Sequence, residues 1–436
     1  MAELVFGSVP VHGHVTPLLA VASGLVERGH RVRFLTGARF ADDVAETGST
    51  FVALPPEADF DDRDLLAGIT DEERPPGVRG LRYDVREVFL RPAPHQYAAL
   101  GALVAQPTDA VLVDPGFLGA GMLISRPRSQ RPPVIMAGVL PMLLSSAAVP
   151  PFGLGLRPLP NAALNRVRNA ALRVLVERVI FGSVQAEAQT VFRMASARPL
   201  DRFVLDWMGS ADAIAQFSVP AFEYPRPDAT VPLHFFGPMP ASSDLPTPQW
   251  WGELDGPAPV VLVTQGTVAN QDLGELVRPT VDALADSDAL VVVTTGGRPV
   301  PEVGTLPSNV RAAEYLPYDQ LFPKLDLLVT NGGYGGVHYA LAHAVPIVVA
   351  GGGEDKPEVA ARVAWSGVGV NLRTGRPKSE AIRRAVRRVL DDPSYRVAAQ
   401  RVASQIAAAP GIGGLEKLIL DLAAERGSDP PGADGT

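Results

Sequence analysis

TNGGYGGVHYALAHAVPIVVAGGGEDKPEVA, residues 330–360, combines apolar runs with two glycine-rich turns. A mostly apolar run at 325–329 leads into the first turn, at 331–336, and a helical segment follows it. The second apolar run, 346–349, ends in three glycines before the charged turn Glu354-Asp355-Lys356. This order predicts a βαβ unit whose strand-to-helix turn presents backbone N–H groups to an anion. Both turns should lie at the same edge of one parallel sheet.

The same alternation of short apolar runs and helical segments recurs along the 436 residues, which exceed the usual size of a single core. Segment 238–250, rich in Pro and Ser, has no periodicity and is predicted to be an interdomain linker. The predicted fold class is therefore α/β, with two doubly wound, Rossmann-like domains at 1–237 and 251–410 that face each other across a cleft. Residues 426–436 are predicted to be a disordered tail. Strands are expected at 4–8, 31–35, 110–113, 133–137, 260–264, 290–294, 310–313, 327–329, 347–349 and 369–372.

Composition excludes several classes of protein. The formal net charge of -8 argues against nucleic-acid binding, which needs a basic surface. There is no cysteine, and the seven histidines lack the spacing of a metal site, so neither a metal nor a bound cofactor is expected. No signal peptide is evident, and no run reaches the ~18 apolar residues of a membrane span. We expect a soluble cytoplasmic protein, with a homodimer left open.

The first predicted sheet offers candidates for acid–base chemistry, because ligands of open α/β sheets bind beyond the carboxyl ends of the strands. His14 stands at a strand-to-helix turn, where the helix dipole favours a neutral imidazole suited to a general base. A helix N-cap or a surface histidine explains the same residue equally well, and His12 is a second candidate. Asp114, after the strand at 110–113, could orient a histidine through its other ring nitrogen, but an Asx-turn is the simpler explanation.

The second predicted sheet offers an anion site. Glycines at 332–336 permit close backbone approach, and because no Walker lysine follows, a P-loop NTPase is disfavoured. Gly266-Thr267 would add an amide and a hydroxyl, unless Thr267 only caps the next helix. Asp355 is either a first-turn helix charge or a group that binds hydroxyls. The apolar, Pro- and Gly-rich segment 142–160 is predicted to form a wall over a hydrophobic cleft.

Two stretches carry a resemblance to a known family: FGSVPVHGHVTPLLAVASGLVERGHRVRF at 6–34 and TNGGYGGVHYALAHAVPIVVAGGGEDKPEVAARV at 330–363. Together they resemble the UDP-glycosyltransferase superfamily, in particular its bacterial macrolide-type branch, and the layout matches residues 3–425. The resemblance implies a GT-B fold, an inverting and metal-independent transfer, and a sugar nucleotide held by the C-terminal half. It also implies that the last helix, 411–425, packs back on the N-terminal domain.

By position, His14 matches the family's general base and Asp114 the acid that orients it. The resemblance implies that the donor is bound by Gly266, Thr267, Asn331, Gly333, Gly335, Gly336, Asp355 and Lys356. The apolar segment supplies the expected acceptor-binding residues Met142, Phe152 and Leu154.

Three positions depart from the family's pattern. Asn331 stands where most relatives have a phosphate-binding histidine, so it can donate a hydrogen bond but supplies no cation. Tyr339 replaces the glutamate that commonly reaches the ribose, which favours a deoxyribose donor such as a dTDP-sugar. Asp355-Lys356 replaces an acidic-glutamine pair near the sugar, which leaves the choice of sugar open.

The resulting hypothesis is an inverting transfer of a hexose from a UDP- or dTDP-sugar co-substrate to a hydroxyl of an apolar acceptor, such as a polyketide, macrolide or phenolic natural product. A GT-B sugar-nucleotide epimerase, which needs no acceptor cleft, is the enzymatic alternative. A catalytically degenerate binding or helper subunit is the non-enzymatic one, because Asn331 and Tyr339 depart from the pattern.

Overall fold

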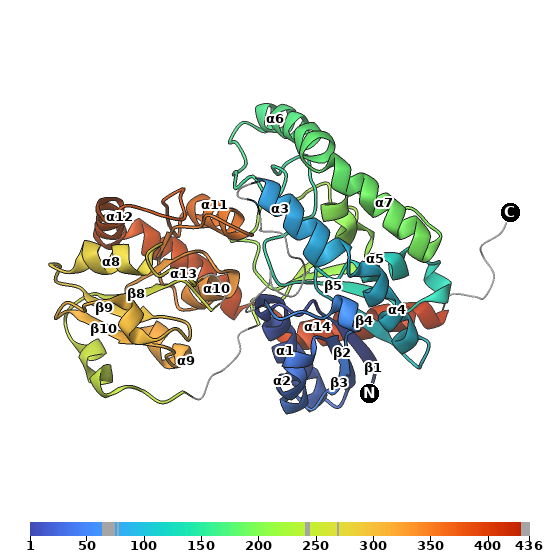
Figure 1. Cartoon of the computed structure of the whole chain (residues 1–436), viewed down its shortest axis with the longest axis horizontal. Helices are drawn as coiled ribbons and strands as arrows, with labels where there is room; N and C mark the ends of the chain where they lie inside the picture. The colour runs from blue at the N-terminus through green and yellow to red at the C-terminus, as the bar shows by residue number, and fades with distance from the viewer. Residues whose placement is uncertain (63–74, 76–77, 240–244, 268–269, 429–436) are drawn as a thin grey trace.

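The computed structural model describes residues 1–62, 75, 78–239, 245–267 and 270–428, and it contains two parallel sheets in two lobes (Figure 1). The first sheet has seven strands in the order β3-β2-β1-β4-β5-β6-β7, and the second has six in the order β10-β9-β8-β11-β12-β13. Every pair of neighbouring strands is parallel. The prediction of two doubly wound α/β sheets is confirmed.

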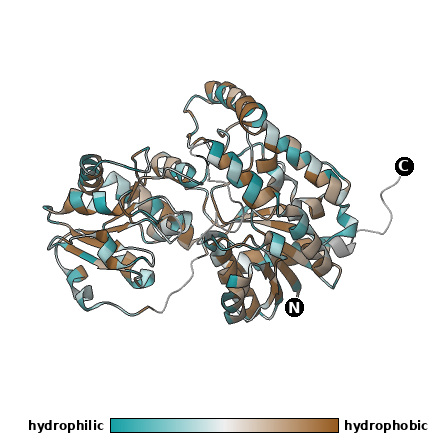
Figure 2. Cartoon of the chain, in the orientation of Figure 1, coloured by the Kyte–Doolittle hydropathy of each residue, from teal (hydrophilic) through white to brown (hydrophobic). Residues whose placement is uncertain are grey.

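The strands of the first sheet are β1 (Glu3–Gly7), β2 (Arg31–Thr36), β3 (Thr50–Ala53), β4 (Ala110–Val113), β5 (Val134–Gly138), β6 (Ala213–Gln216) and β7 (Leu233–Phe235). Those of the second are β8 (Val260–Thr264), β9 (Leu290–Thr294), β10 (Val310–Ala313), β11 (Leu327–Thr330), β12 (Ile347–Val349) and β13 (Gly369–Asn371). The central strands are mostly apolar because helices cover both faces of each sheet, as the hydrophobic colouring of the strands shows (Figure 2).

The helices of the first lobe are α1 (His12–Glu27), α2 (Ala41–Glu46), α3 (Val78–Asp84), α4 (Ala93–Val104), α5 (Gly119–Ile124), α6 (Ala162–Val174) and α7 (Gly182–Ser196). Those that follow β8 are α8 (Val277–Leu284), α9 (Tyr318–Leu321), α10 (Tyr334–Ala342), α11 (Lys356–Ser366), α12 (Ser379–Asp391), α13 (Ser394–Ala407) and α14 (Gly411–Ser428). Two π-helical turns, η4 (Val85–Leu90) and η6 (Leu175–Ile180), continue α3 and α6.

The last helix returns to the first lobe (Figure 1). Leu415, Ile419 and Leu422 of α14 belong to the same buried cluster as the apolar face of α1. His30 Nε2 lies 2.9 Å from Glu416 Oε1, which ties the loop after α1 to α14. The helix continues to Ser428, past the end expected at residue 425, so the predicted tail begins too early.

Several predicted elements differ from the structure. Helix α8 begins at Val277, because the side chain of Gln265 accepts hydrogen bonds from the N–H groups of Leu276 and Val277 and so fixes the first turn there. Strands β3, β6 and β7 were not predicted from the sequence. Much of the predicted linker, residues 240–244, and residues 429–436 of the predicted tail lie outside the described part of the chain.

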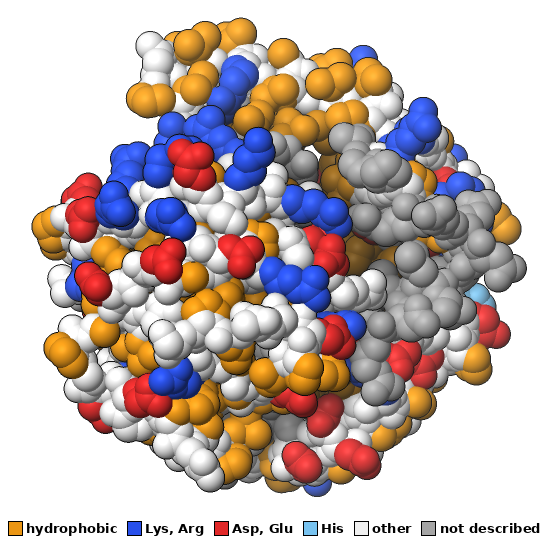
Figure 3. All heavy atoms as spheres, turned by 60° about the vertical axis from the view of Figure 1, so that its left-hand side comes forward, with side chains coloured by type: hydrophobic (Ala, Val, Ile, Leu, Met, Phe, Trp, Pro, Cys, Tyr) orange, Lys and Arg blue, Asp and Glu red, His pale blue; other side chains and the backbone are white. Residues whose placement is uncertain are grey.

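The surface charge is uneven. Figure 3 shows one region of the surface where Lys and Arg side chains gather, although the formal net charge of the chain is -8. Helix α12 contributes four exposed arginines, Arg383, Arg384, Arg387 and Arg388. A negative net charge therefore does not make the whole surface repel anions.

Candidate active site

The structure brings His14 and Asp114 together. Their elements are neighbours, because β1 pairs with β4 with Gly7 opposite Val113, and the turn after β1 leads directly into α1. His14 lies in the first turn of α1, and its Nδ1 is 2.6 Å from Asp114 Oδ1. The two sequence candidates therefore form one hydrogen-bonded pair at the carboxyl end of the sheet.

Asp114 is fully buried and does more than contact the histidine. Its Oδ2 accepts the N–H of Val9 at 2.8 Å, and its Oδ1 accepts the N–H of Gly116 at 2.7 Å. The bond to Gly116 is the Asx-turn that the sequence suggested. The same carboxylate thus forms the Asx-turn and orients His14.

The pair fixes the chemistry of the imidazole. Burial disfavours the charged ring, but the charge and hydrogen bond of Asp114 outweigh it and raise the pKa of His14. Because the carboxylate can only accept, Nδ1 carries the proton, and Nε2 is left to take one from a substrate. The side chain of His14 is 13% exposed, so a substrate can reach it.

His12 is not part of this pair. Its backbone N–H donates to Asp62 Oδ2 at 2.6 Å, and its Nε2 is 3.5 Å from Thr16 Oγ1. Burial is the main cause of a lowered pKa for His12. The geometry therefore favours His14 over His12 as the base.

A cavity of about 430 Å³ opens at the carboxyl ends of β8, β11 and β12, in the second lobe. Two of the predicted donor-binding residues, Asn331 and Lys356, line it. The others, Gly266, Thr267, Gly333, Gly335, Gly336 and Asp355, are not part of the lining. The remaining lining residues are Gln265, Glu275, Leu276, Ala350, Gly352, Gly353, Glu354, Thr374, Gly375 and Arg376.

The glycine turn at 332–336 opens α10. Gly332 has φ +95°, which a glycine adopts without strain, and Gly333 is the residue before the first helical turn. A Cβ at Gly333, Gly335 or Gly336 would meet no atom within 4 Å. The first turn of α10 therefore has open space on its glycine side, as an anion site requires.

Asn331 connects two turns of the second sheet. Its Nδ2 donates to the carbonyl oxygen of Gln265 at 2.6 Å, and it is 9% exposed. The side chain of Gln265 in turn fixes the start of α8. Asn331 thus has a structural role in shaping the cavity, which the sequence comparison with a phosphate-binding histidine did not predict.

Asp355 and Lys356 lie at the N-terminus of α11. Burial is the main cause that raises the pKa of Asp355 to about 6, against a lowering effect of Lys356. The charge of His14 also acts on Asp355, and the charge of Asp355 on His14. The donor turn of the second lobe and the candidate base of the first therefore lie near each other.

Lys356 is the better buried cation of the cavity. Its side chain is 9% exposed and forms an ion pair with Glu354, whose own side chain is 52% exposed. Arg376, the other cation in the lining, is 71% exposed and lies 2.9 Å from Glu275. Because charges act more strongly where water is excluded, Lys356 is the more effective of the two cations.

Tyr339, expected beside the ribose, is not part of the cavity lining. Its ring packs against Tyr318 and Phe322, with ring centroids 5.9 and 5.6 Å away. Burial is the main cause that raises the pKa of Tyr339 to about 12. The structure thus gives no support to the inference of a deoxyribose from this position.

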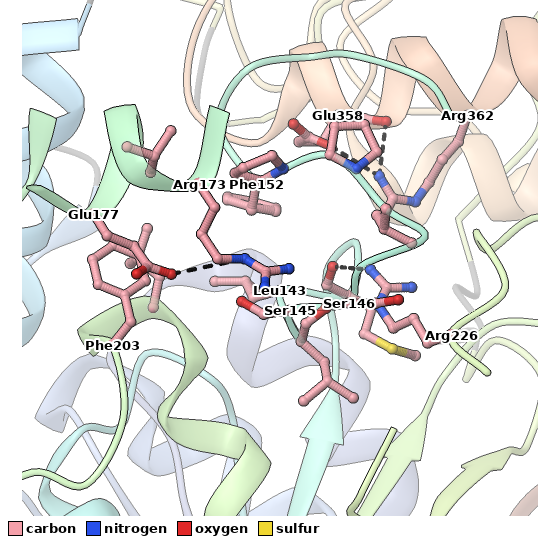
Figure 4. A pocket seen from close by; sticks show the side chains of 17 residues that line it. Leu143, Ser145, Ser146, Phe152, Arg173, Glu177, Phe203, Arg226, Glu358 and Arg362 are labelled. Carbon is pink, nitrogen blue, oxygen red and sulfur yellow. Dashed lines mark hydrogen bonds and ion pairs between the residues drawn. The ribbon is translucent and has the colours of Figure 1, made fainter. Parts of the chain in front are cut away.

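The predicted acceptor residues differ in environment. Met142 is a core residue with 2% exposure, and Leu154 packs against the same core. Phe152 and Met142 line a second cavity, of about 20 Å³, together with Arg173 and Glu177 of the α6–η6 segment (Figure 4). That volume holds about one water molecule.

Sequence reasoning missed a buried charged cluster beside this second cavity. Arg362 Nη2 lies 3.0 Å from Glu223 Oε2, and Arg362 Nη1 lies 3.1 Å from Glu358 Oε2. Arg226 Nη1 is 3.6 Å from Glu223 Oε2. Glu358 and Arg362 share one face of α11 at i, i+4 spacing. This spacing is the one sequence signal from which their ion pair could have been predicted.

The described residues contain no group of three or more His, Cys, Asp or Glu that could hold a metal ion. Within the same ranges, no helix has the length and apolar character needed to cross a membrane.

Comparisons with known proteins agree with this geometry. The family described as "Erythromycin biosynthesis protein CIII-like, C-terminal domain" matches residues 278–418, and "Glycosyltransferase family 28 N-terminal domain" matches residues 7–87. The chain is 41% identical over 431 residues to 4'-demethylrebeccamycin synthase of Lentzea aerocolonigenes, covering 97% of this chain and 99% of that protein. It is 34% identical to UDP-glycosyltransferase 2 of Phaeomoniella chlamydospora, covering 97% and 96%.

A solved structure supports the fold. The calicheamicin glycosyltransferase CalG4 superposes with a TM-score of 0.70 at 23% identity, covering 99% of this chain and 100% of that one. Two facing α/β lobes, with the His14–Asp114 pair in one and the 430 Å³ cavity in the other, have the architecture of a glycosyltransferase of the GT-B fold. The chain belongs to the UDP-glycosyltransferase superfamily, in its macrolide-type branch. The predicted family, fold and enzyme class are confirmed, and neither the epimerase nor the helper alternative is favoured.

Proposed function

We propose that the enzyme transfers a hexose from a UDP- or dTDP-sugar to a hydroxyl of an apolar small molecule, with inversion at the anomeric carbon and without a metal ion. The observation that carries this proposal is the His14–Asp114 pair, with 2.6 Å between Nδ1 and Oδ1, held close enough to Asp355 of the donor turn for their charges to interact. A base in one lobe and a donor turn in the other are the two parts that a direct displacement needs.

In the proposed step, Nε2 of His14 takes the proton of the acceptor hydroxyl as that oxygen attacks the anomeric carbon. The new carbon–oxygen bond forms on the face opposite the leaving nucleotide, and the bond to the diphosphate oxygen breaks with its electron pair. Asp114 stabilises the imidazolium that results, since its carboxylate already raises the pKa of His14. The products are the glycoside, of inverted configuration, and the nucleoside diphosphate.

The diphosphate is assigned to the 430 Å³ cavity and the first turn of α10. The amides at Gly335 and Gly336 lie at the positive end of that helix and have open space beside them. Gly266 and Thr267, after β8, are proposed to add an amide and a hydroxyl. These groups stabilise the negative charge that develops as the bond to the sugar breaks.

Lys356 is proposed to supply the cation that Asn331 cannot. It lines the cavity with a side chain that is 9% exposed, and its partner Glu354 lies at the exposed rim, where an entering diphosphate can replace it. Asp355, beside it, is proposed to accept hydrogen bonds from sugar hydroxyls. In this arrangement Lys356 binds the diphosphate of the donor and Asp355 binds its sugar.

The acceptor is assigned to the segment that contains Phe152 and Leu154, with Met142 as part of the underlying core. The name of one relative, 4'-demethylrebeccamycin synthase, and the apolar character of this segment support an apolar natural product as the acceptor. A cytoplasmic location and a homodimer stay predictions.

A panel of UDP- and dTDP-sugars with phenolic and macrolide acceptors tests the proposal. Glycoside formation is followed by mass spectrometry and the anomeric configuration by proton NMR. We expect an acceptor-dependent product of inverted configuration and its loss in His14→Ala. A His12→Ala variant is the matched control and should keep turnover. Undiminished turnover in His14→Ala, or a product of retained configuration, would overturn the proposed mechanism.

A further inference from the structure

Residues 150–155, here called the lip, carry Phe152 over the smaller cavity. Gly153 and Gly155 have φ +93° and +58°, in the region that favours glycine. These conformations point both N–H groups at one atom, since Glu358 Oε1 accepts from Gly153 at 3.0 Å and from Gly155 at 2.8 Å. A Cβ at Gly155 would lie 2.9 Å from Cβ of Pro357. The lip is therefore shaped to fit against the start of α11.

Glu358 is held firmly on its other side. It is 4% exposed, and its Oε2 pairs with Arg362, which is 1% exposed (Figure 4). Arg362 also pairs with Glu223 of the segment after β6, and its guanidinium carbon lies 4.5 Å from the centre of the Tyr224 ring. These buried ion pairs hold Glu358 in place, because leaving a buried charge unpaired is costly. Glu358 thus joins three parts of the chain: the lip, α11 and the segment after β6.

The same helix begins at the donor site. Helix α11 starts at Lys356, so Glu358 lies in the same helical turn as the cation that lines the nucleotide cavity. A helical turn is stiff because its backbone hydrogen bonds fix the relative positions of its residues. If diphosphate binding shifts the backbone at Lys356, the helix carries Glu358 and the lip bound to it in the same direction.

We propose that Glu358 is a positioning residue that couples nucleotide binding to the acceptor lip. The inference rests on the proposed function, because it requires a diphosphate at Lys356. Nucleotide at the start of α11 fixes Glu358, and Glu358 fixes Gly153 and Gly155, so that Phe152 closes on an acceptor only when the donor is present. Binding of either substrate then favours binding of the other.

Hydrogen–deuterium exchange of the lip amides tests the coupling without an acceptor. UDP and dTDP are the probes, and their dissociation constants are measured by calorimetry on the same samples. In the wild type, we expect saturating nucleotide to slow exchange of the peptide that contains Gly153 and Gly155 by about fivefold or more. In Glu358→Gln, we expect the nucleotide to bind within about twofold of the wild-type affinity while its effect on the lip disappears.

Two further variants separate coupling from a general loss of structure. Gly155→Ala disturbs the contact from the side of the lip and leaves the Glu358–Arg362 pair in place, so it should also abolish the effect of nucleotide. Glu380→Gln, on an α12 side chain that is 77% exposed, should keep it. Nucleotide protection of the lip that persists in Glu358→Gln and Gly155→Ala would overturn the inference, as would its absence in a wild type that binds UDP or dTDP. A wild type that binds neither nucleotide would instead overturn the proposed function on which the inference rests.

Discussion

Asp114→Asn is the substitution whose consequences the structure specifies most fully. The two oxygens of Asp114 accept three N–H groups, from His14, Val9 and Gly116. An amide has a single oxygen, so one orientation points its NH₂ at the N–H of Val9, at a cost of about 1–3 kcal/mol. The other orientation points its NH₂ at His14 and Gly116. That orientation forces the proton onto Nε2 and removes the base.

Either orientation also removes the carboxylate charge that stabilises the imidazolium. By comparison with the same substitution in hydrolytic triads, we expect kcat to fall by about 10³- to 10⁴-fold, which corresponds to about 4–5.5 kcal/mol. The donor KM should change little, because Asp114 lies in the first lobe, on the other side of the site from the nucleotide cavity. An interaction made mainly in the transition state lowers kcat rather than affinity.

The pH profile adds a second, independent readout. A histidine base works in its neutral form, so the rate rises with pH through the pKa of His14. Asp114 raises that pKa, after the opposing effect of burial. In Asp114→Asn the residual activity should therefore reach its plateau at lower pH than in the wild type.

The assay is the initial rate of nucleoside diphosphate release at saturating donor and acceptor, from about pH 5 to pH 9. Asp109→Asn is the matched control, since Asp109 Oδ2 accepts the N–H of Glu3 at 2.7 Å before β4 begins and has no contact with His14. A kcat within about threefold of the wild type in folded Asp114→Asn would refute the role assigned to this carboxylate.

Three other substitutions test the second lobe. Lys356→Met should weaken UDP binding by about 10- to 100-fold, because a charge-assisted contact is worth about 1.5–3 kcal/mol, and calorimetry showing unchanged affinity would contradict the assigned cation. Asp355 has a pKa raised to about 6, so affinity for the sugar nucleotide should fall as the pH drops below that value and its carboxylate is protonated. Asp355→Asn should remove this pH dependence of the affinity, and an unaltered pH profile in that variant would contradict the role assigned to Asp355. Arg362→Met removes the buried cation of Glu358 and leaves Glu223 with Arg226 alone, so urea denaturation should show a loss of about 3–5 kcal/mol in the free energy of unfolding, and a loss below about 1 kcal/mol would contradict the cluster's role.

The fold could be predicted where the strands are central to a sheet. Val260–Thr264 and Ile347–Val349 are buried at every position and apolar except at Thr264, because helices cover both faces, and their bounds were predicted correctly. Thr50–Ala53 and Leu233–Phe235 lie at the two edges of the first sheet and are only partly buried, so their sequences show no comparable run. Edge position does not explain every strand, because the buried inner strand Ala213–Gln216 was also missed, whereas Val310–Ala313 and Gly369–Asn371, at the edges of the second sheet, were predicted.

The pairing of His14 with Asp114 was predicted from the family resemblance, since the residues alone favoured an Asx-turn for Asp114, and the topology explains why the two residues meet. Strands β1 and β4 are parallel neighbours, so the turns that carry His14 and Asp114 must meet at one edge. Glu358 could not be found in this way. Its partners are the N–H groups of Gly153 and Gly155, about 200 residues earlier, and backbone donors leave no mark in the residue types.

The central claim is that His14 removes a proton from the acceptor. The most direct measurement compares turnover of the wild type and His14→Ala with an alkyl alcohol and with an acidic nitrophenol that is already ionised at the assay pH. A phenolate needs no base, so the account predicts a large loss of turnover with the alcohol and a small one with the nitrophenol. Equal losses with both acceptors, or no loss with the alcohol, would contradict it.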